Sequence, residues 1–471
     1  MVKNLLNREL KVLSIGIPTF AQTLREQGCD VVEEDWKPSY HYDFQTMKKL
    51  AHYEREIEEG NQKAVEKIFS SEPVLMDIKY AYEAFPCMDR YTVGHAGPPI
   101  AWADMSHPLK GAILCVIQYE GLAKNDLEAE KLVKEGRIKL VPNHHLGAVG
   151  PMTGMLSYSM PLFEVVNAAH GNTAYSTFNE GLGKVLRFGA GGAEVLERLR
   201  WFRDDFAPLM KEAVRILGGI NLKVVISKAL AMGDEMHQRN IAASAVFLKT
   251  ILPGLLKCTA GKEAILPAVN FLTGNEQFFL NLAMAASKAV MDTCRDIPYC
   301  SLVTAMCRNG TEFGIRVSAL GDEWFRSPAL MPEGLYFPGF SKEDANPDMG
   351  DSAIIETLGI GGFAMGAAPA VVKFLGMGST GQAYRITNEM KKITVRENCQ
   401  FQIPGMNFSG LPTGIDIRKV TEKRILPVIN TGIAHKEAGI GQIGAGVVNA
   451  PIMCFEKALR RFVQELPEFP E

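Results

Sequence analysis

The segment "ALAMGDEMHQRNIAASAV", residues 229–246, contains a cluster of polar side chains inside an otherwise apolar stretch. A helix turns by about 100° per residue, so these side chains would spread over several faces of a helix instead of forming one solvated face. Buried polar groups are costly unless they are paired. The cluster must therefore bind to itself, to another segment or to a ligand. Its members are Asp234, Glu235, His237, Gln238, Arg239 and Asn240.

Two interpretations of this cluster stay open. In the first, the cluster faces a cleft between domains and does chemistry. His237 then transfers protons and Arg239 binds an anion. Asp234 or Glu235 would orient them, and Asn240 would contact the substrate. In the second interpretation the cluster is an internal salt-bridge network, with Glu235 and Arg239 paired at i and i+4. Asp234 is then an N-cap that divides the helix.

A second candidate site is "NHHLGAVGPMTGM", a glycine-rich loop that follows an expected strand. α/β domains place ligand-binding groups in such loops. Neighbouring side chains of an extended backbone point in opposite directions, so only one of His144 and His145 can reach a shared site. We take His145 as a candidate for proton transfer. No metal-ligand spacing accompanies the two histidines, so no metal site is predicted here.

A third candidate is "NEGLGKVLRFG", which offers Asn179, Glu180, Lys184 and Arg187. Its glycines let backbone N–H groups approach a ligand, and its two cations suit an oxyanion or a phosphate. The segment is not a Walker A loop, because Val185 follows the lysine. A plain turn before a solvated helix start explains the same residues equally well.

A fourth candidate is "NTGIAHKEAGIGQIGAG", which contains His435 and a G-x-G-x-x-G pattern at Gly439, Gly441 and Gly444. Such a pattern is weak evidence in a chain with 44 glycines, and no clean strand precedes it. We therefore predict no nucleotide cofactor. A loop that presents His435 to an anion and a simple turn both remain open.

The chain is too long for one core, because domains usually stop growing at about 250–300 residues. The patterns predict a multidomain protein of mixed α/β and α+β class. "KVLSIGI", a helical stretch and "CDVVEEDW" predict a Rossmann-like βαβ unit within an α/β domain over residues 1–145. A mainly helical domain over 146–300 carries the polar cluster. A glycine-rich α+β domain is predicted over 301–471.

Composition narrows the class of function. The net charge of −3 and the absence of a basic block argue against nucleic-acid binding. No uninterrupted apolar run of about 18 residues predicts a membrane span, and the first residues do not resemble a signal peptide. The nine cysteines are scattered without a C-x-x-C pair and predict reduced thiols in a cytoplasmic protein.

Five motifs in one order carry a family resemblance: "HAGPPI", "HHLGAVGPMTG", "NEGLGKVLRFG", "ALAMGDEMHQRN" and "NTGIAHKEAGIGQIGAG". They resemble the bacterial YlbE/YahG-type domain family from about residue 10 to about residue 460. One branch of that family is similar to the large subunit of oxamate carbamoyltransferase, which acts in anaerobic allantoin breakdown. That enzyme interconverts oxalurate and phosphate with oxamate and carbamoyl phosphate.

The resemblance implies an oligomeric complex with an acyl-CoA-synthetase-like partner subunit and a further subunit. Its substrates are small anions, carbamoyl phosphate and an oxamate-like acid. Arg239, Arg187 and Lys184 would then bind anions, and His237 or His145 would move the proton. The alternative is a non-catalytic scaffold or a subunit that binds a small carboxylate.

Overall fold

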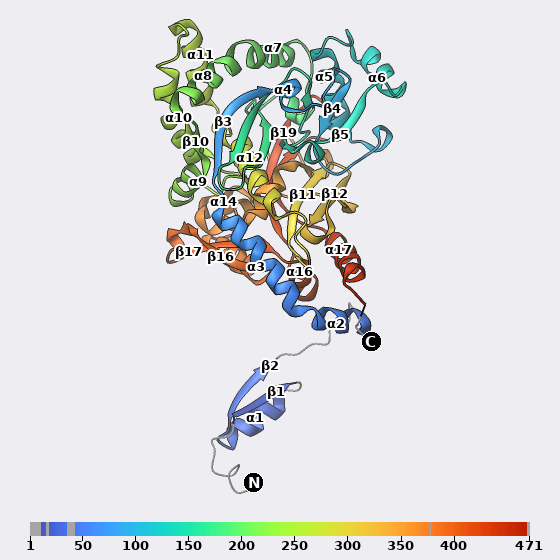
Figure 1. Ribbon diagram of the computed structural model, residues 1–471, viewed down its shortest axis with the longest axis vertical. Coiled ribbons are helices and arrows are strands. Elements are labelled where there is room, and N and C mark those ends of the chain that lie inside the picture. The colour runs from blue at the N-terminus through green and yellow to red at the C-terminus, as the bar shows by residue number, and fades with distance from the viewer. Residues whose placement is uncertain (1–10, 16–17, 35–42, 377, 469–471) are drawn as a thin grey trace. The chain divides into compact units, whose positions relative to one another are not determined.

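The computed structural model describes residues 11–15, 18–34, 43–376 and 378–468. The chain divides into two compact units, Met1–Lys48 and Lys49–Glu471. Figure 1 labels the elements of both units. No helix among the described residues is long and apolar enough to cross a membrane.

The first unit contains a β-α-β arrangement made of β1 (Lys11–Ile15), α1 (Pro18–Glu26) and β2 (Asp30–Glu34). The two strands are parallel, with Lys11 opposite Asp30. The predicted βαβ unit is therefore present as two strands and one helix. Its Rossmann-like character is not confirmed, since the described part of this unit shows no further strand beside these two.

The second unit is built around several sheets. The largest has the order β10-β3-β8-β9-β6 and includes strands from either side of residue 145, the boundary that the sequence predicts. Its strands are β3 (Pro73–Tyr80), β6 (Ala148–Val149), β8 (Pro161–Asn167), β9 (Thr173–Thr177) and β10 (Ile220–Asn221). A four-stranded sheet follows the order β13-β12-β11-β15. Its strands are β11 (Val303–Asn309), β12 (Glu312–Val317), β13 (Phe325–Pro328) and β15 (Met349–Gly350).

The remaining strands of the second unit form three smaller sheets. The first pairs β4 with β5 and β7, the second pairs β19 with β14 and β18, and the third is the hairpin of β16 and β17. Their bounds are β4 (Thr92–His95), β5 (Lys139–Pro142), β7 (Leu156–Ser157), β14 (Glu333–Tyr336), β16 (Thr394–Ile403), β17 (Ser409–Ile415), β18 (Val428–Ala434) and β19 (Gln442–Asn449).

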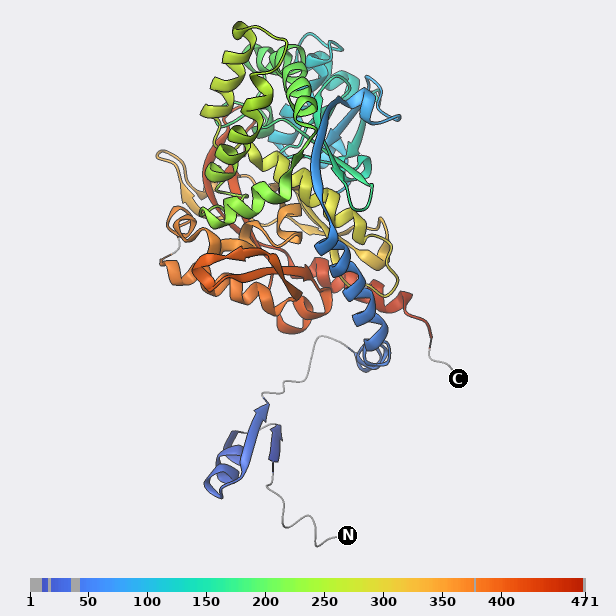
Figure 2. The ribbon, with the colours of Figure 1, turned by 60° about the vertical axis from the view of Figure 1, so that its left-hand side comes forward.

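Helices cover these sheets, and Figure 2 shows the long blue α3 leading up into β3. Along its length α3 packs against β16 and β17 of the hairpin. The remaining α-helices are α2 (Phe44–His52), α3 (Glu54–Ser70), α4 (Ala81–Ala84), α5 (His107–Tyr119), α6 (Asp126–Lys134), α7 (Ala193–Trp201), α8 (Ala207–Leu217), α9 (Leu222–Ala231), α10 (Ile241–Leu255), α11 (Lys262–Gly274), α12 (Phe279–Met291), α13 (Ile354–Thr357), α14 (Pro369–Phe374), α15 (Thr380–Lys392), α16 (Ile417–Lys423) and α17 (Ile452–Glu465). Short 3-10 turns include η3 (Asn143–Leu146), η4 (Leu186–Phe188), η9 (Asp351–Ala353) and η10 (Gly361–Ala367).

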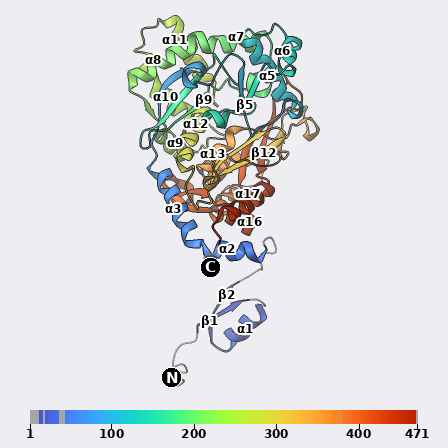
Figure 3. The ribbon, with the colours of Figure 1, turned by 45° about the vertical axis from the view of Figure 1, so that its right-hand side comes forward.

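Helix α12 lies at the centre of the main core. Every residue of its sequence "FLNLAMAASKAVM" is buried, as expected for a helix that is apolar on nearly all faces. It packs against β8 and β9 of the five-stranded sheet and also against α13. Figure 3 shows α12 between the elements of the two larger sheets. This central helix brings α13 close to the segment that precedes α10.

Candidate functional site

A cavity of about 300 Å³ collects several of the predicted site residues. Its wall comes from the loop before α7, the turn between α9 and α10, the start of α12, η9, α14 and the strands β18 and β19. One carboxylate, the exposed Glu276, lies on this wall. The other polar side chains that line the cavity are Arg187, His237, Gln238, Arg239, Gln277, Ser352, Thr431 and Gln442.

The polar cluster lies in a turn, not in a helix. Helix α9 ends at Ala231 and α10 begins at Ile241, so the expected helical arrangement of residues 234–240 is wrong. Gly233 and Met236 have positive φ angles of 96° and 67°, which a helix does not allow. The predicted division of the helix is confirmed by these bounds. Asp234 is not the N-cap residue of α10, which is Asn240, but its Oδ2 accepts a hydrogen bond from the backbone N–H of Ala243 in the first turn of α10 at 2.8 Å.

Glu235 holds this turn together from inside. Its buried carboxylate accepts hydrogen bonds from the backbone N–H groups of His237, Gln238 and Arg239 at 3.2, 2.5 and 2.6 Å. Asn430 of β18 donates a fourth bond at 2.9 Å. The side-chain pair of Glu235 and Arg239 at i and i+4 is therefore absent, because this carboxylate binds backbone instead. Burial raises the pKa of Glu235 to about 7, although these donors oppose the shift.

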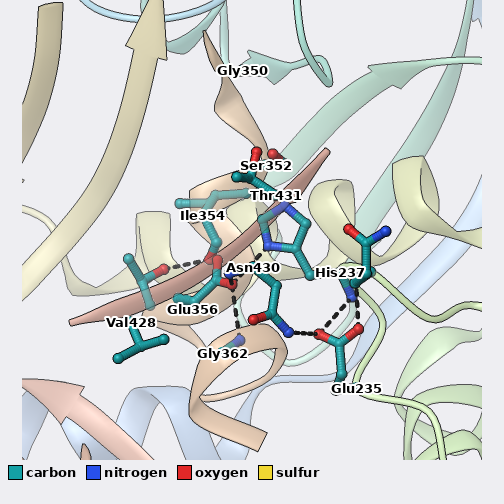
Figure 4. A network of polar contacts seen from close by, with 12 residues as sticks. Glu235, His237, Gly350, Ser352, Ile354, Glu356, Gly362, Val428, Asn430 and Thr431 are labelled. Carbon is teal, nitrogen blue, oxygen red and sulfur yellow. Dashed lines mark hydrogen bonds and ion pairs between the residues drawn. The ribbon is translucent and has the colours of Figure 1, made fainter. Parts of the chain in front are cut away.

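His237 is oriented by a carboxylate from a distant helix. Its Nδ1 lies 2.7 Å from Oε1 of Glu356 in α13, and both side chains are buried. The same oxygen accepts from the backbone of Gly362 at 3.0 Å. An ionised carboxylate only accepts, so Nδ1 carries the proton and Nε2 is left for the cavity. Figure 4 shows the His237 ring directed at Glu356, with Asn430 reaching Glu235 beside it. Such a pair can take up and release a proton.

Arg187 brings a buried positive charge to the cavity. The residue is 7 % exposed, its Nε donates to the carbonyl of Gly181 at 3.0 Å, and its guanidinium stacks 4.7 Å from the centre of the Phe188 ring. Burial lowers the pKa of Arg187 to about 10, so the group stays charged at neutral pH. No carboxylate is within ion-pair distance of this guanidinium in the described part of the chain. An anion in the cavity would supply the missing charge.

Arg239 adds a second, more exposed cation. Its side chain is 36 % exposed, and Nε lies 3.1 Å from Oδ1 of the buried Asp234. Burial raises the pKa of Asp234, an effect that the neighbouring arginine opposes. Asp234 thus partly balances the charge of Arg239 within the turn, and the exposed part of the guanidinium can still bind an anion in the cavity.

Two hydroxyl groups on the wall are supported by a buried ion pair. Arg308 in β11 binds Asp348 through two hydrogen bonds of 2.6 and 3.0 Å. It also donates to Ser352 and Thr431, both at 3.3 Å. Thr431 in turn donates to Asp348 at 2.7 Å. This network fixes the positions of Ser352 and Thr431 at the cavity.

The loop at residues 179–187 is also well ordered by its polar side chains. Glu180 accepts from the backbone of Leu186 and Arg187 at 2.9 and 3.1 Å, and burial raises its pKa. Asn179 accepts from Gly181 N and therefore closes the turn. Lys184 is exposed and does not line the cavity. The α-helix that follows this loop, α7, begins only at Ala193, so Lys184 does not stand at a helix start. Of this candidate group, only Arg187 reaches the cavity.

The other predicted site residues lie around the cavity or away from it. Asn240 is the first residue before α10 and donates to Gln277 at 3.1 Å. His145 accepts from the indole N–H of Trp324 at 3.0 Å and does not line the cavity. His435 accepts from the backbone of Glu437 at 2.9 Å, outside the lining. Gly441 and Gly444 belong to the turn and strand around Gln442, which does line it.

Sequence reasoning missed the most important partner, Glu356. It stands in the apolar run "SAIIETLGIGGFAMG", where an isolated carboxylate indicates a buried, paired charge. The same signal marks Arg308 in "LVTAMCRNG". Ser352, Thr431 and Gln442 carry no comparable signal, because uncharged polar residues are common in glycine-rich segments.

Comparisons with known proteins assign the family. A family profile described as "Oxamate carbamoyltransferase subunit AllG" matches residues 138–352. Oxamate carbamoyltransferase subunit AllG of Escherichia coli (strain K12) is 47% identical over 412 residues, which cover 87% of this chain and 98% of that protein. The uncharacterized protein YahG of the same organism is 41% identical over 464 residues, 98% of each chain.

A solved structure agrees with the fold. It is a conserved protein of unknown function from Enterococcus faecalis V583, which superposes with a TM-score of 0.86 at 42% sequence identity. The similarity covers 88% of this chain and 99% of that chain. The chain therefore belongs to the family that includes the oxamate carbamoyltransferase subunit AllG and YahG, as its motifs indicated.

Proposed function

We propose that the chain is a cytoplasmic subunit of a carbamoyltransferase-type complex in purine and allantoin nitrogen catabolism. The complex interconverts oxalurate and phosphate with oxamate and carbamoyl phosphate, or uses a related acceptor. Its other members are an acyl-CoA-synthetase-like subunit and a further subunit. The observation that carries the proposal is one cavity in which the buried Arg187 and the His237–Glu356 pair occur together. The 47% identity to a protein named as such a subunit supports it.

The cavity chemistry matches the charge of the substrates. Carbamoyl phosphate and oxamate are both anions, and Arg187 and Arg239 provide two cations in the cavity lining. Ser352 and Thr431 add hydroxyl groups that can bond the phosphate or the carboxylate. A volume of about 300 Å³ is at the lower end of small-molecule sites, which suits such short substrates.

The proposed step transfers the carbamoyl group directly. The amide nitrogen of oxamate attacks the carbonyl carbon of carbamoyl phosphate, so a C–N bond forms. The C–O bond to phosphate breaks, and phosphate leaves with the electron pair. Nε2 of His237 accepts the proton from the attacking nitrogen and returns it to the departing phosphate, while Glu356 stabilises the transient imidazolium. The products are oxalurate and hydrogen phosphate.

The test measures phosphate release from carbamoyl phosphate on addition of oxamate, with the chain co-expressed with its partner subunits. Arg187→Gln removes the buried cation while keeping a polar side chain of similar length. We expect the rate to fall by about 10²–10³-fold, since one preorganised charge at developing anions contributes that much. Arg203→Gln is the matched control, because Arg203 pairs with Asp204 and does not line the cavity.

Measuring oxamate binding distinguishes a catalytic subunit from one that only binds a small carboxylate. If the assembled complex binds oxamate by calorimetry but releases no phosphate, the chain is the small-carboxylate-binding subunit of the alternative. If neither binding nor release depends on Arg187, the cavity is not the substrate site. Arg239→Ala gives a second measure. A purely structural ion pair predicts a loss of stability with an unchanged rate, because the buried Asp234 is left without its cation.

A further inference from the structure

Three metal-binding side chains meet behind the wall of the cavity. They are His144 of η3, Cys307 of β11 and Asp351 of η9, and all are buried. One donor atom of each lies within 4.8 Å of the other two. Nε2 of His144 is 3.7 Å from Oδ1 of Asp351. The residues come from segments far apart in the chain, so sequence spacing gave no indication of this cluster.

The imidazole of His144 is unusual, because it forms no hydrogen bond with any residue that the structure describes. Both of its ring nitrogens are buried. Nearly all buried polar atoms in proteins are bonded, and an exception requires an explanation such as a bound ion. Burial and nearby cations hold the pKa of His144 well below its usual range, so the ring is neutral and offers a lone pair. A neutral imidazole is the form that binds metals.

Asp351 is held in position with one acceptor site unused. Oδ2 accepts from Asn143 and Gly150, both at 3.0 Å, and Oδ1 accepts from Gly97 at 2.8 Å. A carboxylate has about four acceptor positions, so these three donors leave one, on the oxygen that faces His144. The carboxylate is therefore fixed by its surroundings in a ligand-like orientation.

Cys307 completes the set with a thiol that makes no hydrogen bond to the described residues. Burial raises the pKa of this thiol well above its usual range, so it becomes a thiolate only when a cation is bound. Thiolate and carboxylate together carry two negative charges, which a divalent ion balances. Carboxylates partly balance the neighbouring cations. Arg308 pairs with Asp348 and Lys288 with Asp292, whereas Arg316 and Arg295 share Asp322. Arg308, Lys288 and Arg316 also lower the pKa of the Cys307 thiol, in opposition to burial, and so favour the thiolate that binds a metal.

We propose that His144, Cys307 and Asp351 bind a divalent transition-metal ion of the zinc class. Zinc bonds of about 2.0–2.3 Å place tetrahedral ligands roughly 3.4 Å apart. The His144–Asp351 distance of 3.7 Å is already close to this value, and donor atoms as far apart as 4.8 Å need to approach by roughly 1.4 Å at most. Sulfur, imidazole and carboxylate are the donors that zinc takes in proteins. Ser352 follows Asp351 in the chain and lines the cavity, as does Pro151 after Gly150. The ion therefore fixes one wall of the cavity from behind, whatever reaction occurs there.

The experiment uses the full chain and Co²⁺ as a spectroscopic substitute for zinc. After removal of metals with a chelator, Co²⁺ is added, and the near-ultraviolet thiolate-to-cobalt charge-transfer band is recorded. We expect the band to appear, and Zn²⁺ to abolish it by displacement. Cys307→Ser is expected to eliminate the band, whereas Cys294→Ser, at a buried cysteine that donates to Ala64 instead, is expected to keep it.

A second measurement covers the case in which Cys307→Ser does not fold. Zn²⁺ is expected to raise the melting temperature of the wild type and to have no such effect on a folded His144→Gln, because a ligand that binds only the native state stabilises it. A folded wild-type chain that shows no band and retains no zinc after desalting overturns the proposal. So does a band that persists in Cys307→Ser. None of these readouts depends on transferase activity.

Discussion

Two buried histidines in this molecule have opposite surroundings. His237 has a carboxylate partner at 2.7 Å and a second nitrogen on the cavity wall. Within the described ranges, His144 has no hydrogen bond at either nitrogen, and it is buried in the core. Both stand next to polar residues that sequence patterns marked as interesting. Their residue type is the same, so the two histidines differ in their hydrogen-bond partners and in whether a ligand in the cavity can reach the ring.

The comparison teaches which chemistry each position supports. A histidine that is oriented by a carboxylate and open to a cavity can exchange protons with a substrate. A sealed, neutral histidine without partners cannot exchange protons, but it can donate a lone pair to a metal ion. The cavity that His237 lines is thus suited to proton transfer, and the cluster around His144 is suited to binding a structural metal ion.

The largest expected effect is a loss of transfer rate when His237 is replaced. His237→Asn removes the proton acceptor but keeps a buried polar side chain, and we expect the transfer rate of the assembled complex to fall by about 10²–10⁴-fold. The melting temperature should change little by comparison, since the turn is held mainly by Glu235. An unchanged rate in a folded variant would remove His237 from the reaction and with it the contrast between the two histidines.

The second effect concerns pH and stability near His237. The pKa of Glu235 is raised from 4.5 to about 7, so the folded state binds this proton more tightly than the unfolded state does. The stabilisation is complete below about pH 4.5 and is lost as the pH rises through about 7. Its size is about 3 kcal/mol, at 1.36 kcal/mol per pKa unit.

Glu235→Gln measures this contribution. Urea unfolding at about pH 5 and about pH 8 should show that the wild type loses roughly 2 to 3 kcal/mol more than the variant, since most of the change falls in this interval. Subtracting the pH dependence of the variant from that of the wild type cancels the contributions of the other titrating groups. The comparison does not require the two proteins to have the same free energy of unfolding. The same pH dependence in both proteins would mean that the four donors keep Glu235 ionised throughout.

The smallest effect is expected at His145, next to His144 in the sequence. His145 is exposed, and its side chain bonds only Trp324 in the part of the chain that the structure describes. His145→Gln preserves an acceptor, so we expect a change of less than about 1 kcal/mol in unfolding free energy and no change in transfer rate. A large loss of rate would bring His145 into the site and weaken the distinction drawn from geometry.

Much of the local structure could be predicted from sequence. Two short apolar segments on either side of a helical pattern indicated the β-α-β opening, and Gly233–Asp234 indicated the break that separates α9 from α10. The polar cluster was recognised as buried and partnered because its composition has no other physical explanation. The error was to continue the helix through it. Local propensity does not reveal that a buried carboxylate, Glu235, collects three backbone N–H groups into a turn.

The sequence by itself determined that a polar, charged cluster interrupts an apolar and largely helical stretch, that it needs partners, and that the chain has the motifs of its family. Only the tertiary structure decided the partners. Glu356 is 119 positions from His237, and Asp351 is 208 positions from Asn143. Periodicity and spacing describe neighbours along the chain, whereas these pairs form because central packing around α12 brings remote segments into hydrogen-bond distance.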